Sequence, residues 1–127
     1  MMRVVMGLLF DNEGKILIAK RNREKMYGGL WEFPGGKIKA EEEIGDALTR
    51  EIFEELRASI KILKIYPSYI FKNSEIQAEF IPVIGRIHND EIVLREHEEC
   101  KFITMDEIIY FKFAPPDYDA VQLLKTL

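Results

Sequence analysis

The segment from Trp31 to Leu56 constrains the fold of this chain more than any other. It begins with an apolar run that ends in a Pro-Gly-Gly turn, continues through an acidic stretch, and closes with apolar residues at a helical period. Glu51, Glu54 and Glu55 stand at i, i+3 and i+4 on that predicted helix, so their side chains share one face. The segment therefore predicts a strand, a glycine loop and a helix that crowds three carboxylates together.

Carboxylates this close together imply a compensating interaction, because each like-charge pair at this spacing destabilises an isolated helix by roughly a few tenths of a kcal/mol. An exposed acidic helix face is the plainer alternative and is common by itself. Hard divalent cations take oxygen ligands, however, and Mg²⁺ is commonly held by carboxylates together with substrate phosphates. The glycines just upstream let the backbone approach a ligand closely, and Lys37 beside them adds a point charge for phosphate. The combination predicts metal-assisted chemistry on a polyphosphate.

From Gly36 onward the sequence resembles the Nudix box, G-x5-E-x7-R-E-U-x-E-E-x-G-U, in which U is a bulky aliphatic residue. The residues that match in place and in spacing are Gly36, Glu42, Arg50, Glu51, Ile52, Glu54 and Glu55. So many fixed positions make a far stronger signal than a lone glycine motif. Two positions depart, because Arg57 replaces the expected glycine and Ala58 replaces the closing aliphatic residue. Glycine would end the helix in a left-handed conformation, which costs arginine roughly 1 kcal/mol.

The resemblance implies roles for the residues of the box. It implies that the metal, Mg²⁺ with Mn²⁺ as a substitute, is held by Glu51, Glu54, Glu55 and the backbone carbonyl of Gly35. Arg50 precedes these ligands, and its planar fork is expected to orient Glu51 or Glu54. Glu42 is expected to stabilise the loop and the start of the helix.

Outside the box, the resemblance to MutT-like enzymes extends to the nucleotide-binding side. Arg21 ends the second predicted strand, where those enzymes place an arginine that touches substrate phosphate, whereas we expect Arg23 to be a solvated loop charge. Phe33 and Phe80 are candidate substrate contacts, although aromatic residues in strands are more often core. Asp117 stands where those enzymes place a residue that hydrogen-bonds the base. Capping of the final helix is the alternative role for Asp117.

The run Glu96-His97-Glu98-Glu99 is the remaining polar feature with a possible role in the chemistry. Family enzymes often place an extra glutamate in such a loop, facing the metals, as general base or further ligand. Glu96 and Glu99 both fit that position. His97 suits a surface histidine and a functional one equally, and the whole run also suits a plain polar turn.

The rest of the chain predicts a mixed β-sheet. Strand-like runs cover residues 3–10, 15–20, 59–71, 75–88 and 98–103, mostly with hairpin connections. Pro82 lies inside one run, which is therefore expected to be an edge strand or to carry a bulge. Thr104 and Glu107 form a capping box that opens a short helix, and Pro115 leads the final helix. We expect one domain over residues 1–127, and the resemblance implies an α/β fold with a Nudix-type α/β/α sandwich.

The composition limits the classes of binding partner that this chain can have. The net charge of −4 argues against binding of a nucleic-acid polymer or an anionic membrane, because both need a positive field. A free nucleotide remains possible, since metal ions bridge acidic protein to acidic substrate. Cys100 is the only cysteine, so no intramolecular disulfide can form and we expect a cytoplasmic protein. We expect its thiol to be buried and inert. Monomer and homodimer both stay open.

The resemblance implies hydrolysis of a nucleoside triphosphate to the monophosphate and pyrophosphate. Oxidised guanine nucleotides and cytosine nucleotides are the candidate substrates. Two alternatives stay open. Nudix enzymes that act on ADP-ribose or other diphosphate-linked nucleosides often carry a proline about fifteen residues beyond the box, where this chain has Asn73. Catalytically inactive domains that only bind nucleotides usually lose box glutamates, all of which are present here.

Overall fold

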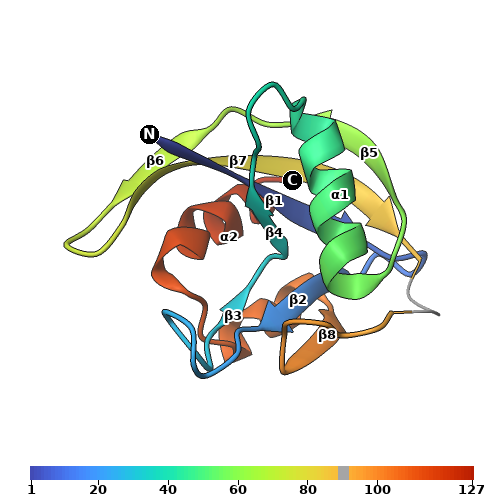
Figure 1. The fold of residues 1–127 in the computed structure, drawn as a ribbon. Helices are drawn as coiled ribbons and strands as arrows, with labels where there is room; N and C mark the ends of the chain where they lie inside the picture. Colours follow the sequence, from blue (N-terminus) through green and yellow to red (C-terminus); the bar gives the residue numbers. More distant parts are fainter. Residues whose placement is uncertain (89–91) are drawn as a thin grey trace.

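The computed structural model describes residues 1–88 and 92–127, which form a mixed sheet between two helices (Figure 1). The strands are β1 (Met2–Phe10), β2 (Ile16–Lys20), β3 (Trp31–Glu32), β4 (Gly35–Lys37), β5 (Ile60–Ile65), β6 (Tyr69–Lys72), β7 (Gln77–Ile87) and β8 (Glu99–Ile103). The helices are α1 (Ile44–Leu56) and α2 (Tyr118–Leu124), with 3₁₀ turns η1 (Met105–Tyr110) and η2 (Pro115–Asp117). The predicted α/β class and the mixed sheet are confirmed.

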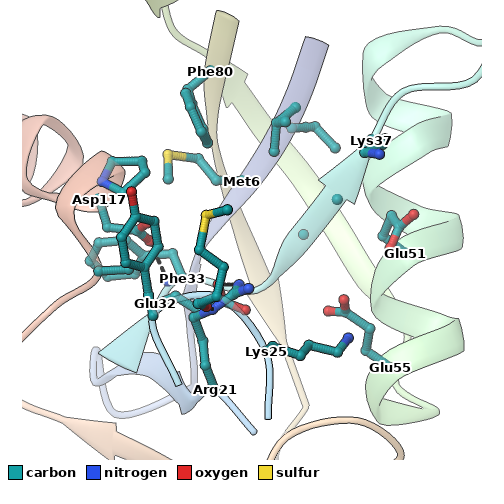
Figure 2. Close-up of a pocket in the computed structure, with 18 of the residues that line it drawn as sticks. Met6, Arg21, Lys25, Glu32, Phe33, Lys37, Glu51, Glu55, Phe80 and Asp117 are labelled. Atoms are coloured by element: carbon teal, nitrogen blue, oxygen red, sulfur yellow. Dashed lines mark hydrogen bonds and ion pairs between the residues drawn. The ribbon is translucent and has the colours of Figure 1, made fainter. Parts of the chain in front are cut away.

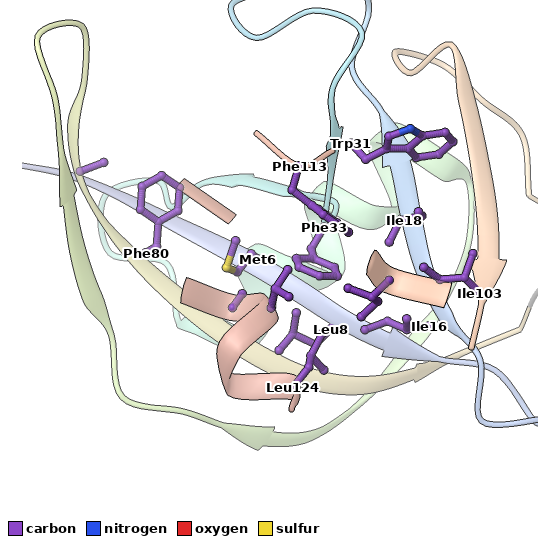
Figure 3. Packing of buried hydrophobic residues seen from close by; sticks show 14 residues of the cluster. Met6, Leu8, Ile16, Ile18, Trp31, Phe33, Phe80, Ile103, Phe113 and Leu124 are labelled. Carbon is purple, nitrogen blue, oxygen red and sulfur yellow. The ribbon is translucent and has the colours of Figure 1, made fainter. Parts of the chain in front are cut away.

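Alternation along β1 explains why helices cover both faces of the sheet. Val5 and Leu9 point to one face and pack in a cluster with the apolar stripe of α1, which includes Leu48 and Ile52. Met6 and Leu8 point to the other face, where the buried residues of α2, Ala120, Val121 and Leu124, join them. The two clusters are the two cores of an α/β/α sandwich, and Figure 3 shows the α2 side.

Strand β1 organises the sheet, because its neighbours bring the two ends of the site together. It pairs in parallel with β7 along its whole length and antiparallel with β2 and β4. The β4 register places Gly36 opposite Val5 and Gly35 opposite Met6. A Cβ at Gly35 would collide with the carbonyl oxygen of Val5, so only glycine allows β4 to lie this close to β1. The glycine strand is thereby held beside α1.

Pro82 does not lie in an edge strand, so that part of the prediction was wrong. It belongs to β7, which has β1 on one side and β5 and β6 on the other. The missing N–H of Pro82 is tolerated because the partner strand changes there: β6 pairs up to Phe80 and β5 pairs from Val83 onward. The carbonyl oxygen of Pro82 still accepts a hydrogen bond from the Tyr66 N–H at 2.9 Å. The register irregularity lies in the partner β5, between Ile62 and Lys64.

Other predicted elements are confirmed with small changes. The run expected over residues 59–71 is split into β5 and β6 around Pro67, whereas the hairpin that follows it is present. The capping box of Thr104 and Glu107 is formed, and it opens a 3₁₀ turn in place of an α-helix. Cys100 is half-buried on β8, and burial raises the pKa of its thiol, which makes it unreactive. Within the described residues, no helix has the length and apolar character needed to cross a membrane.

Candidate active site

A single pocket of about 410 Å³ connects the carboxylates of α1 with an aromatic slot near α2 (Figure 2). Glu51 and Glu55 lie at the α1 end, across from the glycine strand β4. Phe33, Phe80 and Asp117 lie at the other end. The pocket therefore has a charged end and an apolar end, and residues far apart in the sequence build both.

Gly36 lets the carboxylate of Glu51 lie against the backbone of β4. A Cβ at this position would collide with the Glu51 carboxylate, so any other residue would push that side chain away. Gly35 lines the same part of the pocket, one residue upstream. Gly36 therefore allows close approach between the backbone of β4 and a charged side chain.

Arg50 holds the loop before α1 and the acidic face of α1 in one network. Its Nε and Nη2 donate to the two carboxylate oxygens of Glu42, at 2.7 and 2.9 Å. Its Nη1 donates to Glu51 at 2.8 Å and to Glu54 at 3.0 Å, and Nη2 also reaches the carbonyl oxygen of Lys37 at 3.0 Å. The hydrogen bonds from Arg50 lower the pKa of Glu42 to about 2. Arg50 thus orients both glutamates, and the two-point pair with Glu42 fixes the loop.

Glu55 is a buried acid of the pocket whose ionised form is strongly disfavoured. Its side chain is buried, and its Oε1 atom has no hydrogen-bond partner among the described residues. Burial, followed by the negative charges of Glu32, Glu51 and Glu96, raises the pKa of Glu55 to about 9. Among the described residues no side chain forms an ion pair with Glu55, so its ionised form would be stabilised by a bound cation.

The last turn of α1 brings Glu96 to this cluster. The N–H of Val93 donates to the carbonyl oxygen of Leu56 at 2.9 Å, and the N–H of Arg95 donates to that of Glu55 at 3.1 Å. Both bonds satisfy carbonyls that a helix end leaves free. Glu96 follows directly and lines the pocket, whereas Glu99 lies on β8, half-exposed, with an ion pair to Lys101 at 3.3 Å. The structure thus separates the two candidate bases and places Glu96 in the pocket.

The acidic end has the chemistry of a divalent-cation site. The residues described, 1–88 and 92–127, contain no group of three His, Cys, Asp or Glu side chains already gathered around one point. Glu54 is half-exposed and turned toward Arg50, while Glu51 and Glu55 face the pocket. The unpartnered oxygen of Glu55, surrounded by other carboxylates, is what a hard cation with oxygen ligands would satisfy. The donor set therefore fits the group that the box implies.

A chain of bonded side chains, His97, Glu32 and Arg21, crosses the middle of the pocket, and its central residue Glu32 was not singled out from the sequence. His97 is buried, and its Nε2 lies 2.7 Å from Glu32 Oε2. Arg21 Nη1 donates to Glu32 Oε1 at 2.6 Å, and Arg21 Nε donates to the carbonyl oxygen of Met26 at 2.7 Å. Burial opposes ionisation of Glu32, but the His97 hydrogen bond and the Arg21 charge outweigh it and lower the pKa. A glutamate inside the apolar run between Trp31 and Phe33 was the signal available in the sequence.

The other end of the pocket is aromatic. Phe33 stacks on Phe113 with ring centroids 5.1 Å apart, and Phe80 stacks on Tyr69 at 5.7 Å. Asp117 is buried and its Oδ2 accepts a hydrogen bond from the Phe33 N–H at 2.8 Å, so its carboxylate does not cap the final helix. Burial and the nearby Glu32 charge raise the pKa of Asp117 well above its ordinary value. Phe33 and Phe80 are thus core residues that also line the pocket.

Lys37 and Arg57 complete the set of box positions. Lys37 ends β4 at the rim of the pocket, beside Glu51. Arg57 adopts the left-handed conformation expected of glycine, with φ 56° and ψ 27°, and its N–H donates to the carbonyl oxygen of Phe53 at 3.0 Å. Its guanidinium also lies 5.1 Å from the centroid of the Phe53 ring. The turn after α1 therefore forms despite the substitution.

The fold and the site together define an α/β enzyme. Its pocket has a cluster of carboxylates suited to a cation at one end and an aromatic slot at the other. The NUDIX domain profile matches residues 1–124, and the chain belongs to that family. It is 30% identical over 127 residues to an 8-oxo-dGTP diphosphatase of Buchnera aphidicola subsp. Schizaphis graminum, covering 98% of this chain and 93% of the relative.

Two further comparisons agree with the family assignment. A CTP pyrophosphohydrolase of Escherichia coli is 27% identical over 127 residues, covering 97% of this chain and 91% of the relative. The crystal structure of a MutT protein from Methanosarcina mazei superimposes with a TM-score of 0.82 at 23% identity, covering 94% of this chain and 88% of that chain. The resemblance to MutT-like Nudix hydrolases is thereby confirmed.

Proposed function

We propose that this Nudix hydrolase cleaves a nucleoside triphosphate to the monophosphate and pyrophosphate, with Mg²⁺ as its cofactor and Mn²⁺ as a substitute. The observation that carries the proposal is the pocket itself. Its acidic end suits metal and phosphate, and its aromatic end suits a base, within one continuous space of about 410 Å³. The names of the two relatives, an 8-oxo-dGTP diphosphatase and a CTP pyrophosphohydrolase, support the same substrate class.

The acidic end would hold the cation through Glu51, Glu54, Glu55 and the carbonyl of Gly35. Once bound, Mg²⁺ would neutralise phosphate charge and acidify the attacking water. In the reaction, the water oxygen forms a bond to phosphorus while the bond from phosphorus to the bridging oxygen breaks, and pyrophosphate leaves. We assign the proton of the water to a carboxylate oxygen of Glu96, because Glu96 lines the pocket and Glu99 does not. Lys37, at the rim, would offset negative charge on the phosphate chain.

The aromatic end would select the base. Phe33 and Phe80 offer apolar surface, and Asp117, the last residue of η2, lies buried at the same end of the pocket. Burial raises the pKa of Asp117 and so favours its protonated form, while Oδ2 accepts a hydrogen bond from the Phe33 N–H. A protonated acid donates as well as accepts, so an acceptor atom on the base edge would suit it. Oxidised guanine and cytosine triphosphates are the first candidates, and the single cysteine makes the cytoplasm the compartment we propose.

The test is release of pyrophosphate from a panel of normal and oxidised nucleoside triphosphates during a Mg²⁺ titration. We expect turnover that depends on Mg²⁺ and ranks one base clearly above the rest by kcat/KM. Glu54→Gln is the matched variant, because it removes one ligand charge while keeping the shape of a half-exposed side chain. Absence of pyrophosphate release from every triphosphate at millimolar Mg²⁺ would favour a nucleotide-binding domain without catalysis. Cleavage of ADP-ribose in preference to triphosphates would favour the other alternative.

A further inference from the structure

Arg21, the arginine expected to touch substrate phosphate, is already engaged by the protein. Its Nη1 is bonded to Glu32 at 2.6 Å and its Nε to the carbonyl oxygen of Met26 at 2.7 Å, and its side chain is mostly buried. Turning this guanidinium toward a ligand would leave a buried Glu32 oxygen without its charged partner. A different cation of the same loop is better placed to meet a phosphate chain.

Lys25 is that cation. It belongs to the loop between β2 and β3 and lines the pocket, and Figure 2 shows its side chain reaching toward the carboxylate of Glu55. Lys37 lies at the opposite end of the acidic cluster, on β4 beside Glu51. A phosphate chain placed along Glu51 and Glu55 would thus have an ammonium group at each end.

The loop that carries Lys25 is held in a defined conformation. The Lys25 N–H donates to the carbonyl oxygen of Asn22 at 3.0 Å, and the Lys25 carbonyl oxygen accepts from the Gly28 N–H at 2.9 Å. Gly28 packs so closely on the backbone of Arg23 that a Cβ there would collide with it. The bond from Arg21 to Met26 adds a further tie. The backbone at Lys25 is therefore held in place, while its side chain is about half-exposed.

The present partner of Lys25 is easily exchanged. Its Nζ lies 3.8 Å from Glu96 Oε2, at the limit of an ion pair, and both side chains are about half-exposed, 52% and 49%. Pairs of this kind contribute little to stability, and a phosphate oxygen offers an ammonium a stronger, charge-assisted hydrogen bond. Exchange of Glu96 for phosphate would also release the Glu96 carboxylate from its ion pair with Lys25, which favours a role as proton acceptor.

We propose that Lys25 binds the phosphate chain of the substrate, and that Arg21 instead holds Glu32 and the loop in place through its hydrogen bonds. The inference rests on the proposed function, which supplies the phosphate chain. Arg23 provides a matched comparison in the same loop, because it is 80% exposed, pairs with Glu98 at 3.1 Å and does not line the pocket.

The experiment measures binding of Mg²⁺–tripolyphosphate, and separately KM and kcat for the best triphosphate, in the wild type and in Lys25→Met, Lys25→Arg and Arg23→Met. Lys25→Met should weaken tripolyphosphate binding and raise KM by about tenfold, the loss expected for one charge-assisted hydrogen bond. Lys25→Arg should keep most of the affinity, and Arg23→Met should change neither quantity. Thermal unfolding of each variant checks the fold.

The outcomes separate this inference from the proposed function. Lys25-dependent tripolyphosphate binding without hydrolysis of any nucleotide would support the inference and contradict the proposed function. Hydrolysis by the wild type, together with unchanged KM and tripolyphosphate affinity in a folded Lys25→Met, would overturn the inference alone. An equal loss in Arg23→Met would also overturn it, because the effect would then be the general charge of the loop.

Discussion

Glu55→Gln is expected to stabilise the metal-free protein while removing its response to Mg²⁺. The pKa of Glu55 is about 9 in the folded chain, against 4.5 for an ordinary glutamate. An acid whose pKa is raised by folding favours the folded state only while it is protonated. Its contribution is therefore complete below pH 4.5 and is lost progressively as the pH rises to about 9.

The size of the stability change follows from the interval between the ordinary pKa of a glutamate and the pH of the assay. Each unit corresponds to about 1.4 kcal/mol, so the interval between pH 4.5 and pH 7.5 gives a cost of about 4 kcal/mol for the wild type at pH 7.5. Glutamine resembles the protonated acid in shape and does not titrate. Metal-free Glu55→Gln should therefore be more stable by about 4 kcal/mol at pH 7.5 and nearly equal to the wild type at pH 5, a difference of the order of 10 °C in Tm at the higher pH.

Chemical and thermal unfolding between pH 5 and 8, with chelator or with Mg²⁺, measures both effects. Mg²⁺ at about a hundredfold its Kd should stabilise the wild type by about 2.7 kcal/mol and the variant far less. Glu54→Gln is the control for the metal-free series, because its half-exposed carboxylate carries no comparable burial cost. A stability difference between Glu55→Gln and the wild type that stays constant from pH 5 to pH 8 would refute the assignment of Glu55 as a buried, neutral acid.

Three further changes test other parts of the site. Gly36→Ala should displace the Glu51 carboxylate and weaken Mg²⁺ binding by about tenfold or more, measured by calorimetry, and an unchanged affinity would contradict the close contact described between them. Asp117→Asn should alter the ranking of bases by kcat/KM more than the rate on the best substrate, whereas an equal loss on all bases would indicate a purely structural role. Arg50→Lys cannot reproduce the two-point pair with Glu42 and should lower kcat by roughly 10- to 100-fold, and steady-state rates close to the wild type would contradict its orienting role.

The parts of this molecule that could be predicted from the sequence are those that local spacing determines. The helix α1 and its shared acidic face lie within a short segment, so periodicity was sufficient to predict them, whereas the segment expected to be a glycine loop is the strand β4 (Gly35–Lys37). The left-handed turn at Arg57 shows the limit of local reasoning. Its cost as a non-glycine residue was foreseen, but the compensating contacts with Phe53 depend on the conformation itself.

Contacts between distant segments could not be predicted in the same way. His97 and Glu32 are 65 residues apart, and Asp117 and the Phe33 N–H are 84 apart, so only the strand order brings each pair together. The choice between Glu96 and Glu99 depended in the same way on the hydrogen bonds that tie Arg95 to the end of α1. The expectation for Pro82 failed because sequence patterns do not reveal where one neighbouring strand gives way to another.

The change of partner strand at Pro82 affects which parts of the sheet can change independently among related proteins. The hairpin of β6 and β7 on one side of Pro82 supplies Tyr69 and Phe80 to the aromatic end of the pocket, while β5 on the other side contributes Ile60 and Ile62 to the cluster under α1. Because β7 changes its partner strand at Pro82, the β6 end of the hairpin could change in tilt or length with little effect on the β5 register beneath α1. Related chains could in this way come to prefer another nucleobase while keeping the acidic residues of α1 unchanged.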